Sequence, residues 1–154
     1  MRAGITISVW ESIPKYVIVV SDRKETKCMC ENVYDMIIVG SGPAGLTAGI
    51  YGKRAGLKVV ILESGFIQGG QIVNTYEVDN YPGMPGISGM DLGEAMAGHA
   101  AKLGIEPLRE NVLSVEDAGT DKIIRTKTHE YRARTVILAC GASHRKLNIP
   151  GEEE

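Results

Sequence analysis

The chain has 154 residues and carries 17 Lys and Arg against 19 Asp and Glu, so its formal net charge is -2 at pH 7. This near balance argues against a nucleic acid or an anionic membrane as a partner held mainly by bulk charge. Hydrophobic residues make up 44% of the chain and charged residues 23%, which is typical of a globular domain and excludes wholesale disorder. Three cysteines without a regular spacing exclude a small secreted disulfide scaffold, and a chain of this length can bury a core without such bridges.

The first 33 residues differ in pattern from the rest of the chain. The apolar run 16–20 is compatible with a short strand whose partner is not evident, and it is far shorter than a membrane span. Residues 21–27 form a charged run without an apolar period, which is typical of a linker. Because no targeting signal precedes the regular pattern, we expect a cytoplasmic protein.

The next segment has the pattern of a strand, a helix and a second strand. The continuous apolar runs 36–39 and 59–62 predict two strands buried on both faces. Between them, residues 43–55 predict a helix, with Pro43 in its first turn and Gly56 after its last. A unit this short predicts two parallel strands joined by a crossover helix.

A glycine-rich segment and a second helix follow. Residues 64–87 show little periodicity and are too long for an ordinary connection, so we expect a functional loop. Ser88 can cap a helix that ends at Gly104. The expected buried stripe of this helix comprises Leu92, Met96, Ala100 and Leu103. Short strands are then expected at 105–108, 111–116, 122–127 and 130–134, with a last buried strand at 135–139 that runs into Cys140.

The strongest motif lies between the first strand and its helix and reads Gly40-Ser41-Gly42-Pro43-Ala44-Gly45. In a G-x-G-x-x-G loop the first glycine allows the tight turn, the second lets a pyrophosphate approach the backbone, and the third lets the helix pack on the strand. The N–H groups at the helix end favour an anion. A turn that only packs is the alternative, but the strand and helix around the motif favour a dinucleotide site.

Glu63 closes the second strand, at the place where an acid accepts the hydroxyls of an adenosine ribose. No Arg or Lys follows it as far as Gln71, which disfavours a ribose 2′-phosphate. Nicotinamide and flavin dinucleotides share this fingerprint. The loop with Gly69 and Gly70 favours the flavin, because the side-chain amide of Gln71 or Asn80 can donate and accept at the polar edge of an isoalloxazine ring.

Residues 34–151 resemble the front half of the FAD domain of bacterial low-molecular-weight thioredoxin reductases. The segments IIVGSGPAGLTAGIY, GGQI, EVDNYPGMP, GMDL and LACGASHRKLNIPG occur in the order of that family and nearly at its spacing. The resemblance implies an α/β fold, a Rossmann-like FAD-binding domain of three layers. A parallel sheet is expected between helices and a small antiparallel β layer, with the domain incomplete at its C-terminus.

The resemblance also implies what the site residues do. The glycine loop would bind the FAD pyrophosphate, the stretch from Glu63 to Gln71 would line the cofactor, and Asn80 would lie by the flavin ring. The backbone near Val112 would meet the adenine. Cys140 replaces the threonine of the family's Ala-Thr-Gly step, so a hydroxyl hydrogen bond is not expected there. The expected cofactor-binding residues are Gly40, Ser41, Gly42, Pro43, Ala44, Glu63, Gly69, Gly70, Gln71, Asn80, Val112, Ala139, Cys140 and Gly141.

In the family, NADPH reduces FAD, the flavin reduces a Cys-x-x-Cys disulfide, and that dithiol reduces thioredoxin in a homodimeric enzyme. This chain contains neither a Cys-x-x-Cys nor a second glycine fingerprint, so no catalytic residue is expected in it. We expect an extension over 1–28, the front segment of the FAD domain over 29–151, and over 152–154 the start of a crossover to an NADPH domain outside the chain. On this view the chain is a fragment that is inactive alone.

Three alternatives remain open from the sequence. The chain could belong to a ferredoxin–NADP reductase-like protein, to a peroxide-system flavoprotein, or to a non-catalytic nucleotide-binding module. A metal site is not expected, because no further ligand cluster follows Cys28 and Cys30. His99 is expected on a helix near the apolar stripe, and His129 and His144 on the surface.

Overall fold

The computed structural model describes residues 6–8, 18–21 and 33–142. The described helices are α1 (Pro43–Arg54), the 3-10 helix η1 (Gly70–Asn74) and α2 (Gly89–Lys102). The described strands are β1 (Thr6–Ser8), β2 (Ile18–Ser21), β3 (Val33–Val39), β4 (Val59–Glu63), β5 (Leu108–Arg109), β6 (Val112–Asp117), β7 (Lys122–Thr126) and β8 (Glu130–Leu138).

One mixed sheet contains the described strands in the order β1-β6-β7-β8-β3-β4-β5, with β2 paired to β8 beside this path. Strand β3 is central and pairs in parallel with both β4 and β8, as the crossover helix between β3 and β4 requires. Strands β6, β7 and β8 form an antiparallel meander. The sheet therefore has a parallel half and an antiparallel half, and β8 belongs to both.

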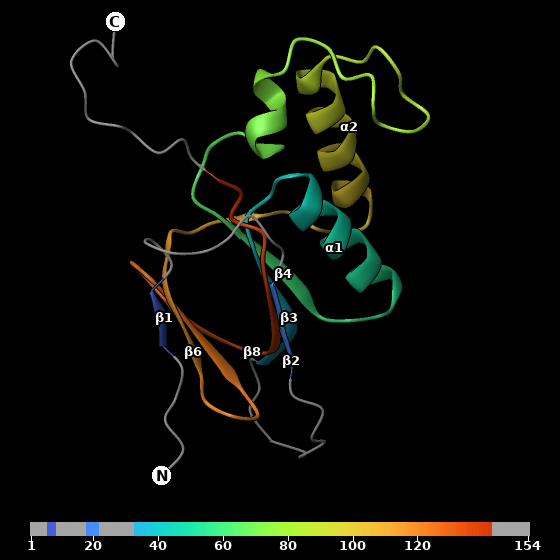
Figure 1. Cartoon of the computed structure of the whole chain (residues 1–154). Helices are drawn as coiled ribbons and strands as arrows, with labels where there is room; N and C mark the ends of the chain where they lie inside the picture. Colours follow the sequence, from blue (N-terminus) through green and yellow to red (C-terminus); the bar gives the residue numbers. More distant parts are fainter. Residues whose placement is uncertain (1–5, 9–17, 22–32, 143–154) are drawn as a thin grey trace, which may run out of the picture.

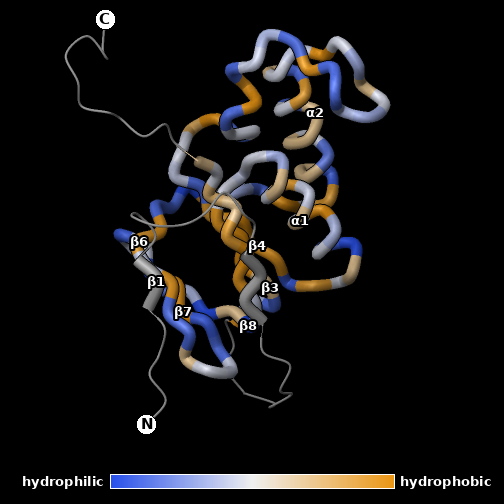
Figure 2. The backbone as a smooth tube through the Cα atoms, in the orientation of Figure 1, coloured by the Kyte–Doolittle hydropathy of each residue, from blue (hydrophilic) through white to orange (hydrophobic). Residues whose placement is uncertain are grey.

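The parallel strands lie between two layers (Figure 1). Helix α1 packs on one face and α2 packs against α1, and the core on this side includes Leu46, Ile50, Leu92 and Met96. The meander packs on the other face, where residues of β6 and β7 join the opposite side chains of β3 and β4 in a second core. Orange, hydrophobic tube runs through the middle of the molecule in Figure 2, because strands buried on both faces need apolar side chains on both. The three-layer α/β architecture expected from the sequence is confirmed.

Both helices begin as the sequence predicts. Pro43 is the first residue of α1, and Gly56 follows the C-cap residue Ala55 with φ 78°. Ser88 is the N-cap of α2, where its Oγ accepts a hydrogen bond of 3.1 Å from the Asp91 N–H. Small residues let α1 lie close to the sheet, since a methyl group at Gly49 would come within 2.9 Å of Ile61 Cδ1.

Several expected boundaries are wrong. The strands expected at 130–134 and 135–139 are one strand, β8, and the strand expected at 105–108 is confined to Leu108–Arg109. The segment 64–87 is not wholly irregular, since it contains η1 and a β-bridge between Val78 and Ile87.

Strand β1 was not expected from the sequence at all, and the partner that β2 lacked in the sequence is β8. The linker expected at 21–27 lies outside the described residues apart from Ser21, and His144 lies outside them altogether.

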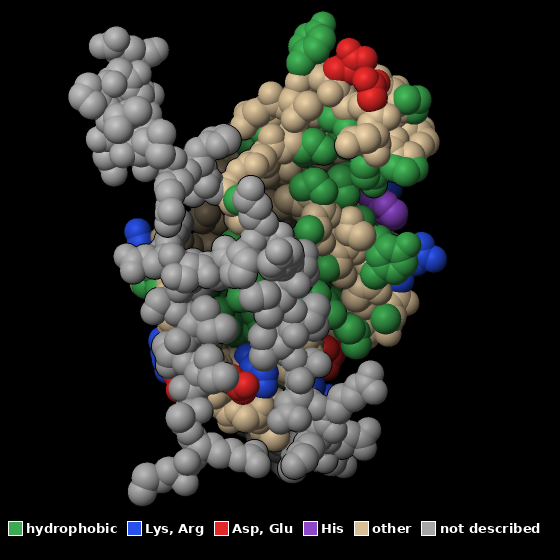
Figure 3. Space-filling view, in the orientation of Figure 1, with side chains coloured by type: hydrophobic (Ala, Val, Ile, Leu, Met, Phe, Trp, Pro, Cys, Tyr) green, Lys and Arg blue, Asp and Glu red, His purple; other side chains and the backbone are tan. Residues whose placement is uncertain are grey.

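Hydrophobic side chains also reach the surface over the helix layer (Figure 3). The exposed ones in this region include Tyr51, Tyr76, Tyr81, Met84 and Met90. Of the helices in the described ranges, none is long and apolar enough to cross a membrane.

Candidate functional site

The loop between β3 and α1 has the shape that its glycines were predicted to give it. Gly40 has φ 104°, and a side chain there would overlap the Ala139 carbonyl of the neighbouring strand end. A side chain at Gly45 would overlap the carbonyl oxygen of Gly40. The first glycine therefore makes the turn and the third brings the helix against it, as the motif requires.

Gly42 differs from these two glycines because no described residue fills the space beside it. Among the residues that the structure describes, a methyl group there would meet only the Gly70 Cα, at an ordinary contact distance of 4.0 Å. Its backbone is extended, with φ -70° and ψ -179°, so any residue could adopt it. The fold itself does not demand a glycine at this position, and the space beside it is open to an incoming group.

The first turn of α1 faces the same space. Gly42 is its N-cap, no side chain caps the helix, and no acidic residue lies in its first turn. The helix therefore supplies no anionic side chain of its own to pair with the positive end of its dipole or with the backbone N–H groups of this turn. Such an end favours the phosphate groups of a ligand.

Glu63 lies directly against the glycine loop. Its Oε2 accepts hydrogen bonds from the Ser41 backbone N–H at 2.7 Å and from the Ser41 hydroxyl at 2.8 Å. Its Oε1 accepts one from the Gly65 N–H at 2.8 Å. Burial acts to raise the pKa of this carboxyl, but the hydrogen bonds from Gly65 and Ser41 outweigh it and hold the pKa below its usual value. The group is thus an anchored, ionised carboxylate at the carboxyl end of β4.

A second loop lies over the first. The Gly69 N–H donates to the Ser41 carbonyl at 2.9 Å, and Gly70 brings its backbone beside Gly42. Both glycines have positive φ, 105° and 60°, a region that favours glycine. A methyl group at Gly69 would come within 3.1 Å of the Gly93 Cα in α2. The second helix therefore holds this loop in place.

The segment after β8 borders the same site. Ala139 donates its N–H to the Val39 carbonyl at 2.8 Å, which fixes the chain beside Gly40. The strand expected at 135–139 was predicted to run into Cys140, but β8 ends at Leu138 and Cys140 is exposed. Partial burial raises the pKa of its thiol, and the nearby Glu63 charge adds to this, so the thiol is protonated at neutral pH.

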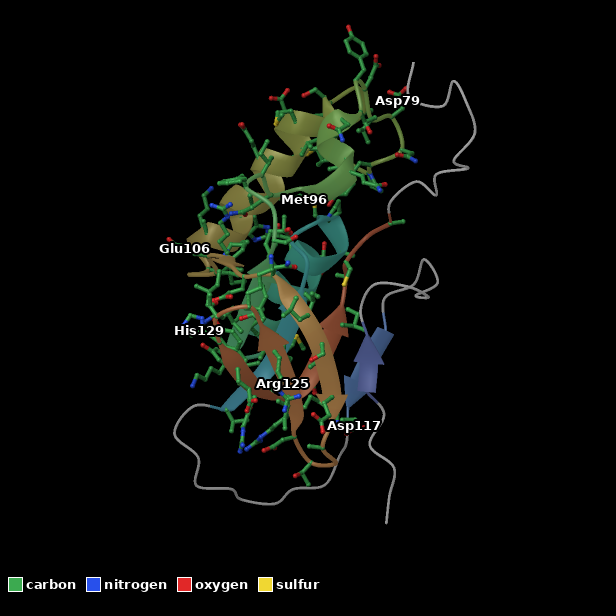
Figure 4. All side chains as sticks on the ribbon, turned by 90° about the vertical axis from the view of Figure 1, so that its left-hand side faces the viewer. Asp79, Met96, Glu106, Asp117, Arg125 and His129 are labelled. Carbon is green, nitrogen blue, oxygen red and sulfur yellow. The ribbon has the colours of Figure 1, made fainter. Side chains whose placement is uncertain are left out.

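The structure brings together most, but not all, of the residues singled out in the sequence. Pro43 and Ala44 begin α1 beside the loop, and Gly141 follows Cys140 with φ 70°. Gln71 is exposed at the start of η1. Asn80 is also exposed, in the loop after η1, and its neighbour Asp79 lies at the end of the molecule remote from the meander residues Asp117 and Arg125 (Figure 4). The Val112 side chain points into the core between β3 and the meander, so only its backbone could meet a ligand.

Sequence reasoning missed one residue at this edge. Arg109 lies opposite Glu63 in the parallel pair β4–β5, although it is far from Glu63 in the chain. The sequence between Glu63 and Gln71 contains no Arg or Lys, but in three dimensions a cation, Arg109, lies beside Glu63. Phe66, three residues after the end of β4, is exposed, and Arg109 lies over its ring, a contact for which the sequence offers no signal.

Within the described ranges, no group of three or more His, Cys, Asp and Glu side chains could hold a metal ion. The site therefore consists of two glycine-containing loops, an open helix end and a carboxylate. These groups can bind a phosphate-containing ligand with a hydroxylated sugar. No side chain among them is placed as a nucleophile or a general base.

Comparisons with known proteins agree with this geometry. The sequence profile of the family described as "Pyridine nucleotide-disulphide oxidoreductase" matches residues 34–154. The thioredoxin reductase of Bacillus subtilis (strain 168) is 44% identical over 124 residues, which are 80% of this chain and 39% of that protein.

Two solved structures extend the likeness to three dimensions. The crystal structure of Lactococcus lactis thioredoxin reductase is similar with a TM-score of 0.74 and 47% identity, over 78% of this chain and 39% of that one. The structure of thioredoxin reductase from Streptococcus pyogenes gives a TM-score of 0.73 and 43% identity, over 80% and 40%. The chain thus spans about 39% of the length of the curated relatives that it matches.

Proposed function

We propose that this chain, which belongs to the pyridine nucleotide-disulphide oxidoreductase family, is the FAD-binding part of a thioredoxin reductase. The proposal rests on one observation above all. In the described part of the chain, backbone atoms close the space beside Gly40 and Gly45 but not the space beside Gly42, so the loop keeps a free path to its N–H groups where a pyrophosphate would approach.

The residues present fit FAD in charge and in shape. The uncapped N-terminal end of α1 would receive the pyrophosphate, and the Gly69–Gly70 backbone beside Gly42 would form the other wall. Glu63 would accept a hydrogen bond from the adenosine ribose through Oε1, where the Gly65 N–H uses one lone pair and the Ser64 hydroxyl lies at 3.5 Å, because Ser41 already donates twice to Oε2. Its lowered pKa keeps it an acceptor at neutral pH.

When bound, the flavin supplies the electron-transfer chemistry. This chain would bind and orient it and exclude water from one side of it. We propose NADPH as the electron donor, a thioredoxin-like protein disulfide as the acceptor and a homodimer as the assembly. The similarity to the Bacillus, Lactococcus and Streptococcus thioredoxin reductases supports these assignments, and it favours them over a ferredoxin–NADP reductase-like protein, a peroxide-system flavoprotein or a non-catalytic module.

The test is the substitution Gly42→Val, with Gly98→Val as its matched control. A side chain at either glycine meets open space or an ordinary contact, so both variants should fold. Only the first blocks the approach to the loop. Titration of the chain with FAD, followed by quenching of flavin fluorescence, should show binding by the wild type and by Gly98→Val and none by Gly42→Val. Equal binding by all three would refute the site.

A further inference from the structure

Two side chains from distant parts of the sequence meet beside Glu63. Phe66, in the loop after β4, is 82% exposed. The Arg109 guanidinium lies over its ring, with Cζ 3.3 Å from the ring centroid. Arg109 reaches this place because β5 pairs in parallel with the end of β4, opposite Glu63. A large apolar ring is thus held at the surface by a cation instead of packing into the core.

The pair borders a shallow cavity at the carboxyl end of β4. The cavity has a volume of about 120 Å³ and is lined by Glu63, Gly65, Phe66, Gln68, Pro107 and Arg109. It combines one carboxylate, one guanidinium and one aromatic ring. The carboxylate is the group assigned to the ribose under the proposed function, so the base attached to that ribose lies within reach of this cavity.

Arg109 is available to a ligand. In the described part of the chain it forms no ion pair, whereas Arg125 and Lys122 are each paired with a carboxylate. A stacked guanidinium keeps its N–H donors in plane and offers a flat face. Flat aromatic rings and arginine faces are the surfaces on which nucleobases stack.

We propose that Phe66 and Arg109 form the platform on which the purine base of the bound dinucleotide stacks. The inference rests on the proposed FAD site and adds to it the residues that recognise the adenine end. Glu63 fixes the ribose, and the platform beside it fixes the base, so the two together distinguish a dinucleotide from a flavin mononucleotide.

A second arginine on an aromatic ring provides the matched control. The Arg54 guanidinium lies 5.9 Å from the centroid of the exposed Tyr51 ring, at the last turn of α1. This pair is of the same chemical kind, but its members are close neighbours on one helix, and neither lines the cavity beside Glu63. Removing its charge should therefore leave ligand binding unchanged.

The experiment compares the dissociation constants of FAD and FMN for the wild type, Arg109→Gln, Phe66→Leu and Arg54→Gln, with thermal unfolding as the check on folding. Loss of base stacking should weaken FAD by about 5- to 100-fold in Arg109→Gln. FMN, which has no purine, should bind all four chains equally. Phe66→Leu should act in the same direction, and Arg54→Gln should match the wild type.

Other outcomes separate this inference from the proposed function. Unchanged FAD affinity in Arg109→Gln, or an equal loss for FMN and FAD, would overturn the platform and leave the flavin site standing. Binding of 2′,5′-ADP more tightly than 5′-ADP, lost in Arg109→Gln, would make Arg109 a phosphate ligand and overturn base stacking. Arg109-dependent binding of 5′-ADP without any flavin binding would support the platform and refute the FAD assignment. Failure of the wild type to bind FAD, FMN and 5′-ADP would refute both.

Discussion

The two ends of the sheet use polar groups in opposite ways. In the meander, charged side chains pair with one another and with the backbone. Beside the glycine loop, no described side chain caps the first turn of α1, and no described residue fills the space that the backbone at Gly42 faces. Polar groups that hydrogen-bond to one another stabilise a fold, whereas polar groups without a partner in the protein can hydrogen-bond to a ligand. The difference locates binding at one end and structure at the other.

Lys122 shows that charged groups of the meander find their partners within the protein. Its side chain is 2% exposed, and its Nζ donates to Asp117 Oδ1 at 2.8 Å and to the Gly119 carbonyl at 2.7 Å. On the outer face, Arg125 bridges Glu116 and Glu130, which joins the three strands of the meander. These charges are used within the fold.

Glu110 connects the two ends. Its backbone N–H donates to the Glu63 carbonyl at 2.9 Å. Its side chain accepts hydrogen bonds from Thr128 Oγ1 at 2.7 Å and from Tyr131 OH at 3.2 Å, and its Oε1 lies 2.6 Å from His129 Nδ1. In Figure 4, the label of His129 lies between those of Glu106 and the meander residue Arg125. Glu110 therefore links the segment that carries Arg109 to the hairpin between β7 and β8.

The largest expected effect separates two glycines of one motif. In Gly45→Ala the new methyl group would overlap the Gly40 carbonyl, which is backbone and cannot rotate away. We expect a loss of at least about 3 kcal/mol in the free energy of unfolding, measured by urea denaturation. Gly42→Ala should unfold within about 0.5 kcal/mol of the wild type. Equal stability of the two variants would show that the loop does not have the described shape.

The next effect concerns the buried pair of the meander. Asp117→Ala leaves the Lys122 ammonium buried with only the Gly119 carbonyl as a partner, and should cost about 2 kcal/mol. Lys122→Met should cost about 1 kcal/mol, because the Asp117 side chain is 38% exposed and water can solvate it. Chemical denaturation of both variants tests this order. A larger loss in Lys122→Met would mean that the carboxylate, and not the ammonium, depends on the pair.

Glu110 gives a pH-dependent effect. Hydrogen bonds lower the pKa of its carboxyl from 4.5 to about 2, and the hydrogen bond from Thr128 contributes most to this change. A lowered pKa in the folded state contributes stability that is fully present above pH 4.5 and is lost as the pH falls towards 2. Glu110→Gln should therefore cost about 1 kcal/mol at pH 7 and reduce the loss of stability below pH 4.5.

Thermal unfolding at a series of pH values measures this effect. The exposed Glu106, replaced by Gln, is the control and should leave the acid profile as it is in the wild type. Parallel profiles for Glu110→Gln and the wild type would contradict the role of Glu110 as the junction.

The smallest effect tests the helix that supports the second loop. Ser88→Ala removes the hydrogen bond to the Asp91 N–H and should cost about 0.5–1 kcal/mol. Because α2 holds Gly69 through Gly93, FAD affinity should fall slightly in the same variant. A fall in stability with unchanged affinity would show that the loop keeps its position without the first turn of α2.

The sequence was informative where structure is local. The strand, helix and strand around Gly42, and the cap at Ser88, could be predicted because apolar periodicity and the turn residues coincide in short segments. Two strands were predicted where the structure has the single strand β8, because the burial of its side chains changes along its length. Its first half is part of the meander and alternates, while its second half is buried within the parallel sheet.

Contacts between distant segments could not be predicted. Arg109 joins Phe66 through strand pairing, and Glu110 joins the hairpin between β7 and β8 through side chains, so no local pattern points to either. The 3-10 helix η1 was missed because five residues give no period. Val112 entered the expected site through resemblance alone, and its side chain lies in the core between β3 and the meander. Asn80 entered through its amide as well as through the resemblance, and it is exposed in the loop after η1.

The most direct test of the central claim is to follow the backbone amide signals of the isotope-labelled chain while FAD is added. We expect the largest shifts at Ser41, Gly42, Glu63 and Gly70, with the signals of Lys122 and Arg125 in the meander unchanged. Shifts confined to the meander, or no shifts at FAD concentrations that saturate flavoproteins, would contradict the assignment of the open end as the binding site.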